Sequence, residues 1–287
     1  MIMFDSIAID CSGMSPADIR AATVASVAEH RLAYLRGFPL DVARYTDLLE
    51  HLGELCPNYA AGSASDAYAL HPAVNTVRCR APEPGGEQRV QEKAGSLPLH
   101  TGRSFARRRP LHLAMLMADP GWRDFAPGHN GESLIVRWGD VLRAVRERHP
   151  EHWAEDLRLL TANSVSFPAS HLDEEPSALP FLYVPGTPRL TPVPDDVAVR
   201  LPQDVTRLGR AAERMPDGER WYEAVVRFKA TADDPEVHQA YVMEAGDVVV
   251  IDNDRYGHGR QEVVATRTAP DGGTAVNPRT IWSVNIQ

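Results

Sequence analysis

The sequence predicts an α+β fold in which N-terminal helices flank a mostly antiparallel β core. Two stretches with helical periodicity and capping residues occupy the N-terminal end, and apolar runs of strand length, separated by turns, recur through much of the remainder. The chain of 287 residues is long for an average domain but fits one large β-sandwich or barrel with insertions. No flexible linker divides it, so we expect a single domain over residues 1–287.

Capping residues and periodicity predict the first elements. Residues 15–30 are expected to form a helix with Ser15 as its N-cap. The stretch "RLAYLRGFPL" has the composition of a strand that ends at a glycine turn. It is followed by "DVARYTDLLEHLGEL", which is predicted to be a second, amphipathic helix capped by Asp41.

The rest of the chain alternates between long irregular segments and predicted strands. Residues 60–95 are rich in Gly, Ser, Pro and charge, which predicts a long loop or lid. The proline-rich residues 168–220 are expected to form an insertion rather than a separate domain. A helix is predicted for "WGDVLRAVRERH", and the predicted strands are "PLHLAMLMAD", "ESLIVRW", "RWYEAVVRFKAT", "AGDVVVIDN" and "NPRTIWSVNI".

Composition narrows the classes of function. The formal net charge of −9 argues against a broad surface for a nucleic-acid polymer, although a local arginine cluster can still bind an anionic small molecule. The three cysteines lack CxxC spacing and favour buried thiols over disulfides or zinc. The N-terminus does not resemble a signal peptide, and no window approaches the ~20 apolar residues of a membrane span. We expect a cytoplasmic protein with a small-molecule ligand and no membrane partner; its oligomeric state is left open.

Two segments stand out chemically. The first is "LPLHTGRSF", which contains His100, and the second is "AGDVVVIDNDRYGHGRQEV", which contains His258. In the second segment an apolar strand runs into an Asp-Asn turn, and the histidine follows within a short polar stretch. A lone histidine is usually a packed or surface residue, and eleven are present. The flanking context of these two favours metal ligands instead.

Together these segments resemble the iron(II)/2-oxoglutarate oxygenases of the taurine dioxygenase and clavaminate synthase-like superfamily. "GDVVVIDNDRYGHGR" matches the distal histidine motif of that family, and "GESLIV" matches its Gly-Asp/Glu-Thr/Ser strand. The resemblance implies a double-stranded β-helix core of the jelly-roll or cupin-like type. It also implies a single catalytic domain that uses Fe(II), 2-oxoglutarate and O2, with His100 and His258 as the iron ligands.

The same resemblance assigns the cosubstrate site. Arg279 would form the salt bridge to the C5 carboxylate of 2-oxoglutarate, because a guanidinium matches a carboxylate bidentately. Ser133 would add a hydroxyl to that carboxylate. Arg279 lies 21 residues after His258, farther than is usual in the family, and the turn-rich residues 268–273 account for the extra length. Arg267 is the alternative.

Gly102 stands where the family has the Asp or Glu ligand of its HxD/E motif. Glycine leaves an iron position without a protein carboxylate, and a chloride ion can supply both the ligand and the negative charge. This HxG variant resembles the iron/2-oxoglutarate halogenases, which replace an unactivated C–H by C–Cl while 2-oxoglutarate becomes succinate and CO2. The predicted halide donors are the amides of Gly102 and Arg103 and the hydroxyl of Ser104.

Other interpretations of Gly102 remain open at this stage. The protein could be a hydroxylase of an amino acid or another small metabolite that uses two histidines with water or with a carboxylate from elsewhere. It could be a non-catalytic ligand-binding relative, or Gly102 could be a bulge glycine.

The substrate is predicted from the arginines that follow the motif. "GRSFARRRP" favours a phosphorylated molecule, such as an adenine deoxynucleotide, chlorinated as a free small molecule in secondary metabolism; a free amino acid is the alternative. The candidate substrate-binding residues are His71, Phe105, Arg107, Tyr256 and Ser283.

Overall fold

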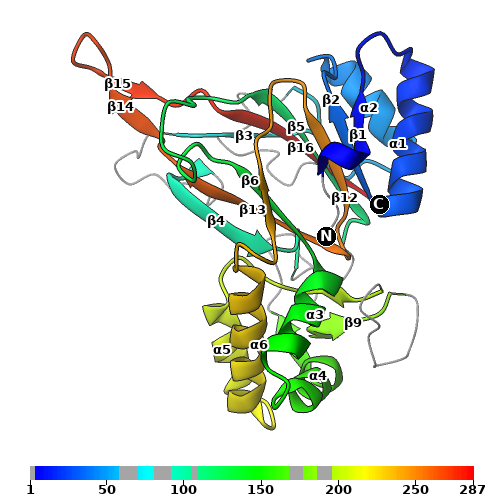
Figure 1. Cartoon of the computed structure of the whole chain (residues 1–287), viewed down its shortest axis with the longest axis vertical. Coiled ribbons are helices and arrows are strands. Elements are labelled where there is room, and N and C mark those ends of the chain that lie inside the picture. Colours follow the sequence, from blue (N-terminus) through cyan, green and yellow to red (C-terminus); the bar gives the residue numbers. More distant parts are fainter. Residues whose placement is uncertain (1–3, 58–69, 81–91, 105–108, 168–176, 186–195) are drawn as a thin grey trace.

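A computed structural model describes residues 4–57, 70–80, 92–104, 109–167, 177–185 and 196–287. Two β-sheets form the upper part of the molecule in Figure 1. The larger sheet has the order β1 (Ala8–Asp10), β2 (Leu32–Arg36), β12 (Val248–Asp252), β5 (His112–Asp119), β16 (Thr280–Ile286) and β3 (Asn75–Arg78). The smaller has the order β11 (Gln239–Tyr241), β6 (Ser133–Arg137), β13 (Tyr256–Val263) and β4 (Gly95–His100). Among these strands only β1 and β2 pair in parallel, so the prediction of an α+β fold with a mostly antiparallel core is confirmed.

Side-chain alternation along the large sheet separates two cores. On β12, Val248 and Val250 pack with the N-terminal helices, whereas Val249 and Ile251 pack in the cluster shared with the small sheet. Strand β16 alternates in the same way, because successive side chains of a strand point to opposite faces. Its residues Ile281, Ser283 and Asn285 therefore face a cavity between the sheets.

The N-terminal helices cover the outer face of the large sheet (Figure 1). Helix α1 (Pro16–His30) begins as predicted at Ser15, whose hydroxyl accepts from the Asp18 N–H. Helix α2 (Val42–Glu50) begins at Asp41, whose carboxylate accepts from the Arg44 N–H. These caps satisfy backbone donors that a helix start leaves unpaired.

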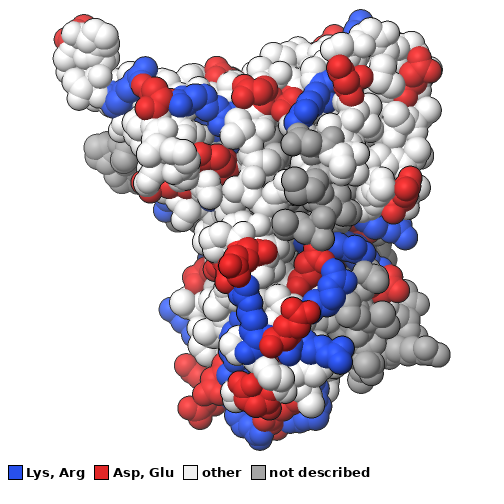
Figure 2. Space-filling model, viewed as in Figure 1, with Lys and Arg blue, Asp and Glu red and all other residues white. Residues whose placement is uncertain are grey.

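A helical unit lies below the sheets in Figure 1, between β6 and β11 in the chain. Its helices are α3 (Trp138–Arg148), α4 (Trp153–Ala162), α5 (Thr206–Ala212) and α6 (Gly218–Ala232), with short strands β7 (Ser164–Phe167), β8 (Ser177–Pro180), β9 (Leu182–Tyr183) and β10 (Ala198–Val199). The unit has its own apolar core around Trp138, Phe181 and Trp221. Figure 2 shows charges of both signs gathered over its surface. The described residues of the predicted insertion 168–220 lie within this unit, while 168–176 and 186–195 are outside the described residues.

The prediction of a strand for "RWYEAVVRFKAT" is wrong, because these residues belong to helix α6. Its buried residues include Trp221, Ala224, Val225 and Phe228, which repeat at three- and four-residue spacing. That spacing is the period of a helix facing a core on one side, whereas a half-buried strand would alternate every second residue.

Two further segments bear on the predictions. The predicted lid, 60–95, contains strand β3, while 60–69 and 81–91 lie outside the described residues. Residues 268–273 join β14 (Thr266–Thr268) to β15 (Thr274–Val276) in a hairpin that projects from the sheets (Figure 1). Within the described part of the chain, no helix combines the length and apolar character needed to cross a membrane.

Candidate active site

His100 and His258 form a cross-strand pair between the edge strand β4 of the small sheet and its neighbour β13. Strands β4 and β13 are antiparallel, and these two residues are direct register partners. Side chains that are directly opposite on neighbouring strands share a face. Their imidazole rings accordingly lie 4.2 Å apart between centroids, at an angle of 48°.

Both imidazoles are held neutral by burial. Burial lowers the pKa of His100 to about 4, although its hydrogen bond to the Pro98 carbonyl opposes this shift. Burial, together with the neighbouring His100, lowers the pKa of His258 well below its usual range. Nδ1 of His258 is buried and has no hydrogen-bond partner among the described residues. Neutral imidazoles with available lone pairs are the form that binds metals.

Gly102 is clamped by the side chain of Asn253. The Gly102 N–H donates to Asn253 Oδ1 at 3.0 Å, and Asn253 Nδ2 donates to the Gly102 carbonyl at 3.0 Å. The expectation that the Gly102 amide donates to a halide is therefore wrong for this arrangement, because Asn253 already takes that hydrogen. A Cβ built on Gly102 would lie 3.7 Å from His258 Cε1, so a side chain here would start toward the histidine pair.

Arg279 is a buried cation at one end of the cavity. It precedes β16 and is 3 % exposed, and it donates from Nη2 to the Gly131 carbonyl at 3.1 Å. Its Nε is buried and has no partner among the described residues. Burial, with a further contribution from Arg260, lowers the pKa of Arg279 to about 9. Ser133 on β6 lines the same cavity, and its hydroxyl contacts Met243 Sδ at 3.4 Å.

Arg267 occupies a different place. It lies on the β14–β15 hairpin, forms a salt bridge with Asp124 at 2.9 Å and stacks on Trp122. Its side chain is 45 % exposed and does not line the cavity. Position therefore favours Arg279 over Arg267 for an anion bound beside the histidines.

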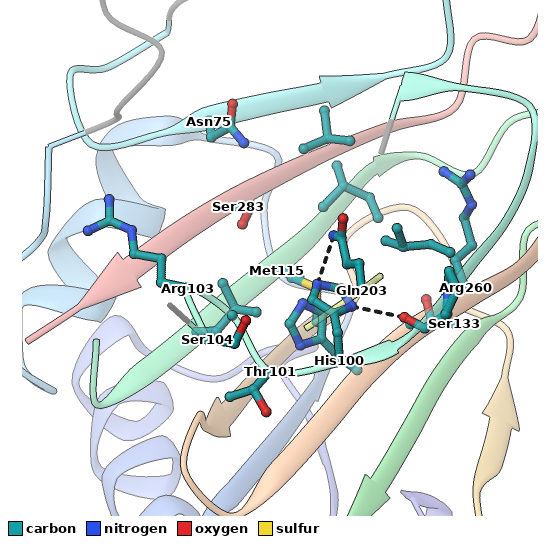
Figure 3. A pocket seen from close by; sticks show the side chains of 18 of the residues that line it. Asn75, His100, Thr101, Arg103, Ser104, Met115, Ser133, Gln203, Arg260 and Ser283 are labelled. Atoms are coloured by element: carbon teal, nitrogen blue, oxygen red, sulfur yellow. Dashed lines mark hydrogen bonds between the residues drawn. The ribbon is translucent and has the colours of Figure 1, made fainter. Parts of the chain in front are cut away.

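The cavity that joins these residues has a volume of about 520 Å³. Figure 3 shows its two ends: Arg103, Ser283 and Asn75 lie to one side of His100, and Ser133 and Arg260 lie to the other. The predicted residues Arg103, Ser104 and Ser283 thus share one cavity with the histidine pair.

Other predicted substrate residues are not in this cavity. Tyr256 is 3 % exposed, packs between the two sheets and donates its hydroxyl to the His30 carbonyl, so its prediction as a substrate contact is wrong. His71 lines a separate cavity beside α2 with Glu50 and Glu54, so the structure does not bring it to the histidine pair. Phe105 and Arg107 lie outside the described residues.

Comparison with known proteins identifies the family. The family model described as "Taurine catabolism dioxygenase TauD, TfdA family" matches residues 8–273. The chain belongs to this family. It is therefore an oxidoreductase of the iron(II)/2-oxoglutarate-dependent oxygenases. A search of curated proteins gave no match to the sequence.

Solved structures of other oxygenases share the fold. An asparagine oxygenase in complex with Fe(II), 2S,3S-3-hydroxyasparagine and succinate is 19% identical, with a TM-score of 0.61 over 94% of this chain and 79% of that one. PvcB of Pseudomonas aeruginosa is 16% identical, with a TM-score of 0.56 over 97% and 82%. The non-heme iron oxygenase OrfP, in complex with Fe, succinate and (3R,4R)-dihydroxy-L-Arg, is 18% identical, with a TM-score of 0.54 over 95% and 80%. At these low sequence identities the comparison shows a shared fold only.

The residues present fit the cofactors of this TauD-type oxygenase. Two neutral histidines face one cavity, and at its end lies the buried guanidinium of Arg279, whose Nε–H has no partner in the described part of the chain. His100 and His258 could hold iron, and Arg279 with Ser133 could hold the far carboxylate of 2-oxoglutarate. Among the described residues, no cluster of three His, Cys, Asp or Glu side chains supplies a complete metal site. The donor set that the structure describes is two histidines without a carboxylate.

Several lining residues gave no signal in the sequence. Gln203 and Arg207 come from the helical unit, and Asn75 comes from the segment predicted as a lid. Arg260 has a basic side chain in "HGR" that reads equally well as a solvated charge, yet it is 4 % exposed and donates to the Lys93 and Gly95 carbonyls. Only tertiary structure brings Gln203, Arg207 and Asn75 to the histidines, whereas Arg260 follows His258 on the same strand.

A buried polar cluster supports the loop behind Gly102. Asp254 forms an ion pair with Arg109 and accepts from the Tyr183 hydroxyl at 2.9 Å. The guanidinium groups of Arg109 and Arg200 lie over the Tyr183 ring, with 5.3 Å and 5.1 Å to its centroid. Arg200 also donates to the Ser104 carbonyl. The cluster therefore ties the loop 101–104 to the Asp-Asn turn and to the helical unit.

Proposed function

We propose that this oxygenase is a halogenase, which chlorinates an unactivated C–H bond of a free small molecule. The main support is the glycine at position 102. A Cβ built there would lie 3.7 Å from His258 Cε1, and among the described residues no Asp or Glu completes a three-residue metal site with the two histidines. Iron and 2-oxoglutarate supply the oxidising chemistry with O2. The balanced reaction converts R–H, chloride, 2-oxoglutarate, O2 and one proton to R–Cl, succinate, CO2 and water.

The protein's own residues have separate tasks in this proposal. His100 and His258 hold the metal as neutral ligands, and Arg279 with Ser133 orients 2-oxoglutarate from the far end of the cavity. Gly102 leaves space for the halide, with the Arg103 amide and Ser104 on the same loop as candidate donors. Substrate position then selects chlorine over hydroxyl, since placement on the ångström scale controls which atom is transferred.

Charge supports a phosphorylated substrate, such as an adenine deoxynucleotide. Among the described residues that line the cavity are four arginines (Arg103, Arg207, Arg260 and Arg279) and one aspartate (Asp204), a formal charge of +3. Iron(II), dianionic 2-oxoglutarate and chloride add −1 in total, which leaves +2. A phosphate monoester dianion would balance that charge, and arginine suits phosphate recognition. Ser283 and Asn75 offer hydrogen-bonding groups at the same end as Arg103.

Hydroxylation of an amino acid is the second candidate. The solved structures similar to this chain include an asparagine oxygenase with 3-hydroxyasparagine and OrfP with a dihydroxyarginine. In that case water takes the position that Gly102 leaves, and the cavity binds the carboxylate of a free amino acid.

One experiment separates these candidates. Enzyme, Fe(II), 2-oxoglutarate, chloride and O2 are incubated with a panel of deoxynucleotides and a panel of amino acids, and products are examined by mass spectrometry. Deoxynucleotide products with the chlorine isotope pair support the proposal. Chlorinated amino acids would support halogenase activity but refute the proposal of a nucleotide substrate. Hydroxylated products alone, with chloride present, would overturn the halogenase.

A further inference from the structure

Gln203 reaches the centre of the candidate metal site from the helical unit. It lies between β10 and α5, and its side chain lines the cavity. Its Nε2 is 3.1 Å from Nε2 of His100, the hydrogen bond drawn in Figure 3. Gln203 therefore contacts Nε2, the His100 nitrogen that is available to bind a metal because Nδ1 is hydrogen-bonded to the Pro98 carbonyl.

The proton positions at this contact follow from the groups on each side. His100 Nδ1 is 2.9 Å from the Pro98 carbonyl, which can only accept, so Nδ1 carries the ring proton. Nε2 of His100 therefore has the lone pair, and the amide of Gln203 is the donor. A metal at that nitrogen takes the lone pair and leaves the Gln203 amide needing another acceptor. Fixing the ring through a carbonyl at Nδ1 is the usual arrangement of a metal-binding histidine.

The segment that carries Gln203 is fastened to the histidine loop. The Thr101 N–H donates to the Leu201 carbonyl at 2.8 Å, and the Thr101 hydroxyl donates to the Val199 carbonyl at 2.9 Å. The Leu201 N–H donates back to that hydroxyl at 3.4 Å. Because Thr101 follows His100 directly, these bonds hold the backbone near Gln203 in a fixed place relative to the imidazole.

We propose that the Gln203 amide donates a hydrogen bond to the anion that takes the coordination position left by Gly102. The Gly102 N–H is committed to Asn253, so Gln203 supplies a donor from outside the motif loop in addition to the Arg103 amide and Ser104. An anion in a partly dry site needs such a donor, and a charge-assisted hydrogen bond is roughly twice as strong as a neutral one. The inference rests on the proposed function in one respect, the identity of the anion, because a halogenase would bind chloride at this position.

Anion affinity tests the inference without turnover. The protein is loaded with Co(II) and 2-oxoglutarate under anaerobic conditions, and chloride and azide are titrated separately while the visible d–d bands are recorded. Gln203→Met keeps the length and removes the donor. Gln261→Met is the matched control, since Gln261 lies on β13 outside the cavity. Gln203→Glu places a carboxylate at the same point.

The expected result is that Gln203→Met weakens binding of both anions by about tenfold or more. Metal and 2-oxoglutarate affinities should stay within about threefold, and Gln261→Met should match the wild type. Gln203→Glu should weaken anion binding further through like-charge repulsion. These results support the inference.

Other outcomes separate it from the proposed function. Equal chloride affinity in wild type and Gln203→Met overturns the inference and leaves the halogenase standing. Azide binding that depends on Gln203, with no chloride effect in the wild type, keeps the donor role and overturns the halogenase. Absence of any anion effect overturns both.

Discussion

Gly102→Asp tests the proposed function most directly, and its cost can be worked out from the structure. A Cβ at this position would lie 2.9 Å from Asn253 Oδ1, the atom that accepts from the Gly102 N–H. Asn253 is fully buried and also donates to the Gly102 and Pro110 carbonyls, so it cannot swing away without losing hydrogen bonds. Overpacking of this kind costs about 1–3 kcal/mol. For a chain of this size that lowers the Tm by about 2–6 °C.

The carboxylate acts beyond this packing cost. It competes with the halide for one coordination position, and two anions in a desolvated site repel strongly. Chlorination should therefore fall by at least about a hundredfold, or about 2.7 kcal/mol in the barrier. Metal binding should be retained, because the new side chain starts 3.7 Å from His258 Cε1 and restores a third ligand type.

Gly102→Ala is the matched control, since it adds the same Cβ without the carboxylate. Both variants should lose similar stability in thermal unfolding, while only Gly102→Asp loses chlorinated product by mass spectrometry. If Gly102→Ala lost chlorination as completely as Gly102→Asp, the glycine would serve the contact with Asn253 rather than the halide. Chlorination surviving in Gly102→Asp would also refute the reasoning.

Three further predictions follow from the site. Arg279→Ala should weaken 2-oxoglutarate binding by at least about a hundredfold in calorimetry, because it removes the buried guanidinium that would bind the far carboxylate, while Arg267→Ala changes it little. Asp254→Asn should lower the free energy of unfolding in urea by about 3–5 kcal/mol, because it removes the carboxylate that pairs with buried Arg109 and whose charge also favours Arg200. Asp196→Asn, at an exposed carboxylate paired with Arg255, should cost under about 1 kcal/mol. Burial lowers the pKa of His100 from 6.5 in the unfolded chain to about 4 in the folded protein, so the unfolded state binds more protons between these values. The free energy of unfolding of the metal-free protein should therefore decrease as pH falls from about 6.5 to 4, by at most about 1.4 kcal/mol per pH unit for this residue. His100→Gln should reduce this dependence in urea unfolding measured across the same pH range.

Local rules predicted the parts of the fold that depend on neighbouring residues. The N-caps Ser15 and Asp41 and the apolar strand before the Asp-Asn turn were all identifiable, because each involves groups a few positions apart. The prediction of a strand at α6 relied on aromatic and β-branched residues, which are common in strands. Contacts of α6 with α3 and α4 show which of its residues are buried, and these repeat every three or four positions as in a helix.

The site divides in the same way. His100, Gly102 and His258 stand in recognisable motifs, and their strands pair directly. Gln203 has no motif, and the structure brings it to His100 across 103 residues of chain. Tyr256 lies two positions before His258 on the same strand, so alternation alone places both side chains on one face. Its ring instead fills the apolar cluster between the sheets and its hydroxyl donates to the His30 carbonyl, contacts that only the tertiary structure reveals.

The turn at Asp252 and Asn253 explains why the coordination position without a carboxylate at Gly102 would be filled by an ion or water from solution rather than by a rearranged side chain. Asn253 holds the backbone of Gly102 on both its N–H and its carbonyl, and Asp254 anchors Arg109 and Tyr183 behind the same loop. On the other side, Thr101 is bonded to the backbone of the helical unit. A loop fixed on both sides cannot shift another of its own side chains into the third ligand position without breaking buried hydrogen bonds, each of which costs about 1–3 kcal/mol when left unsatisfied. A small exogenous anion or water meets no such cost, so the rigidity of the loop and the absence of a side chain at Gly102 favour the same outcome.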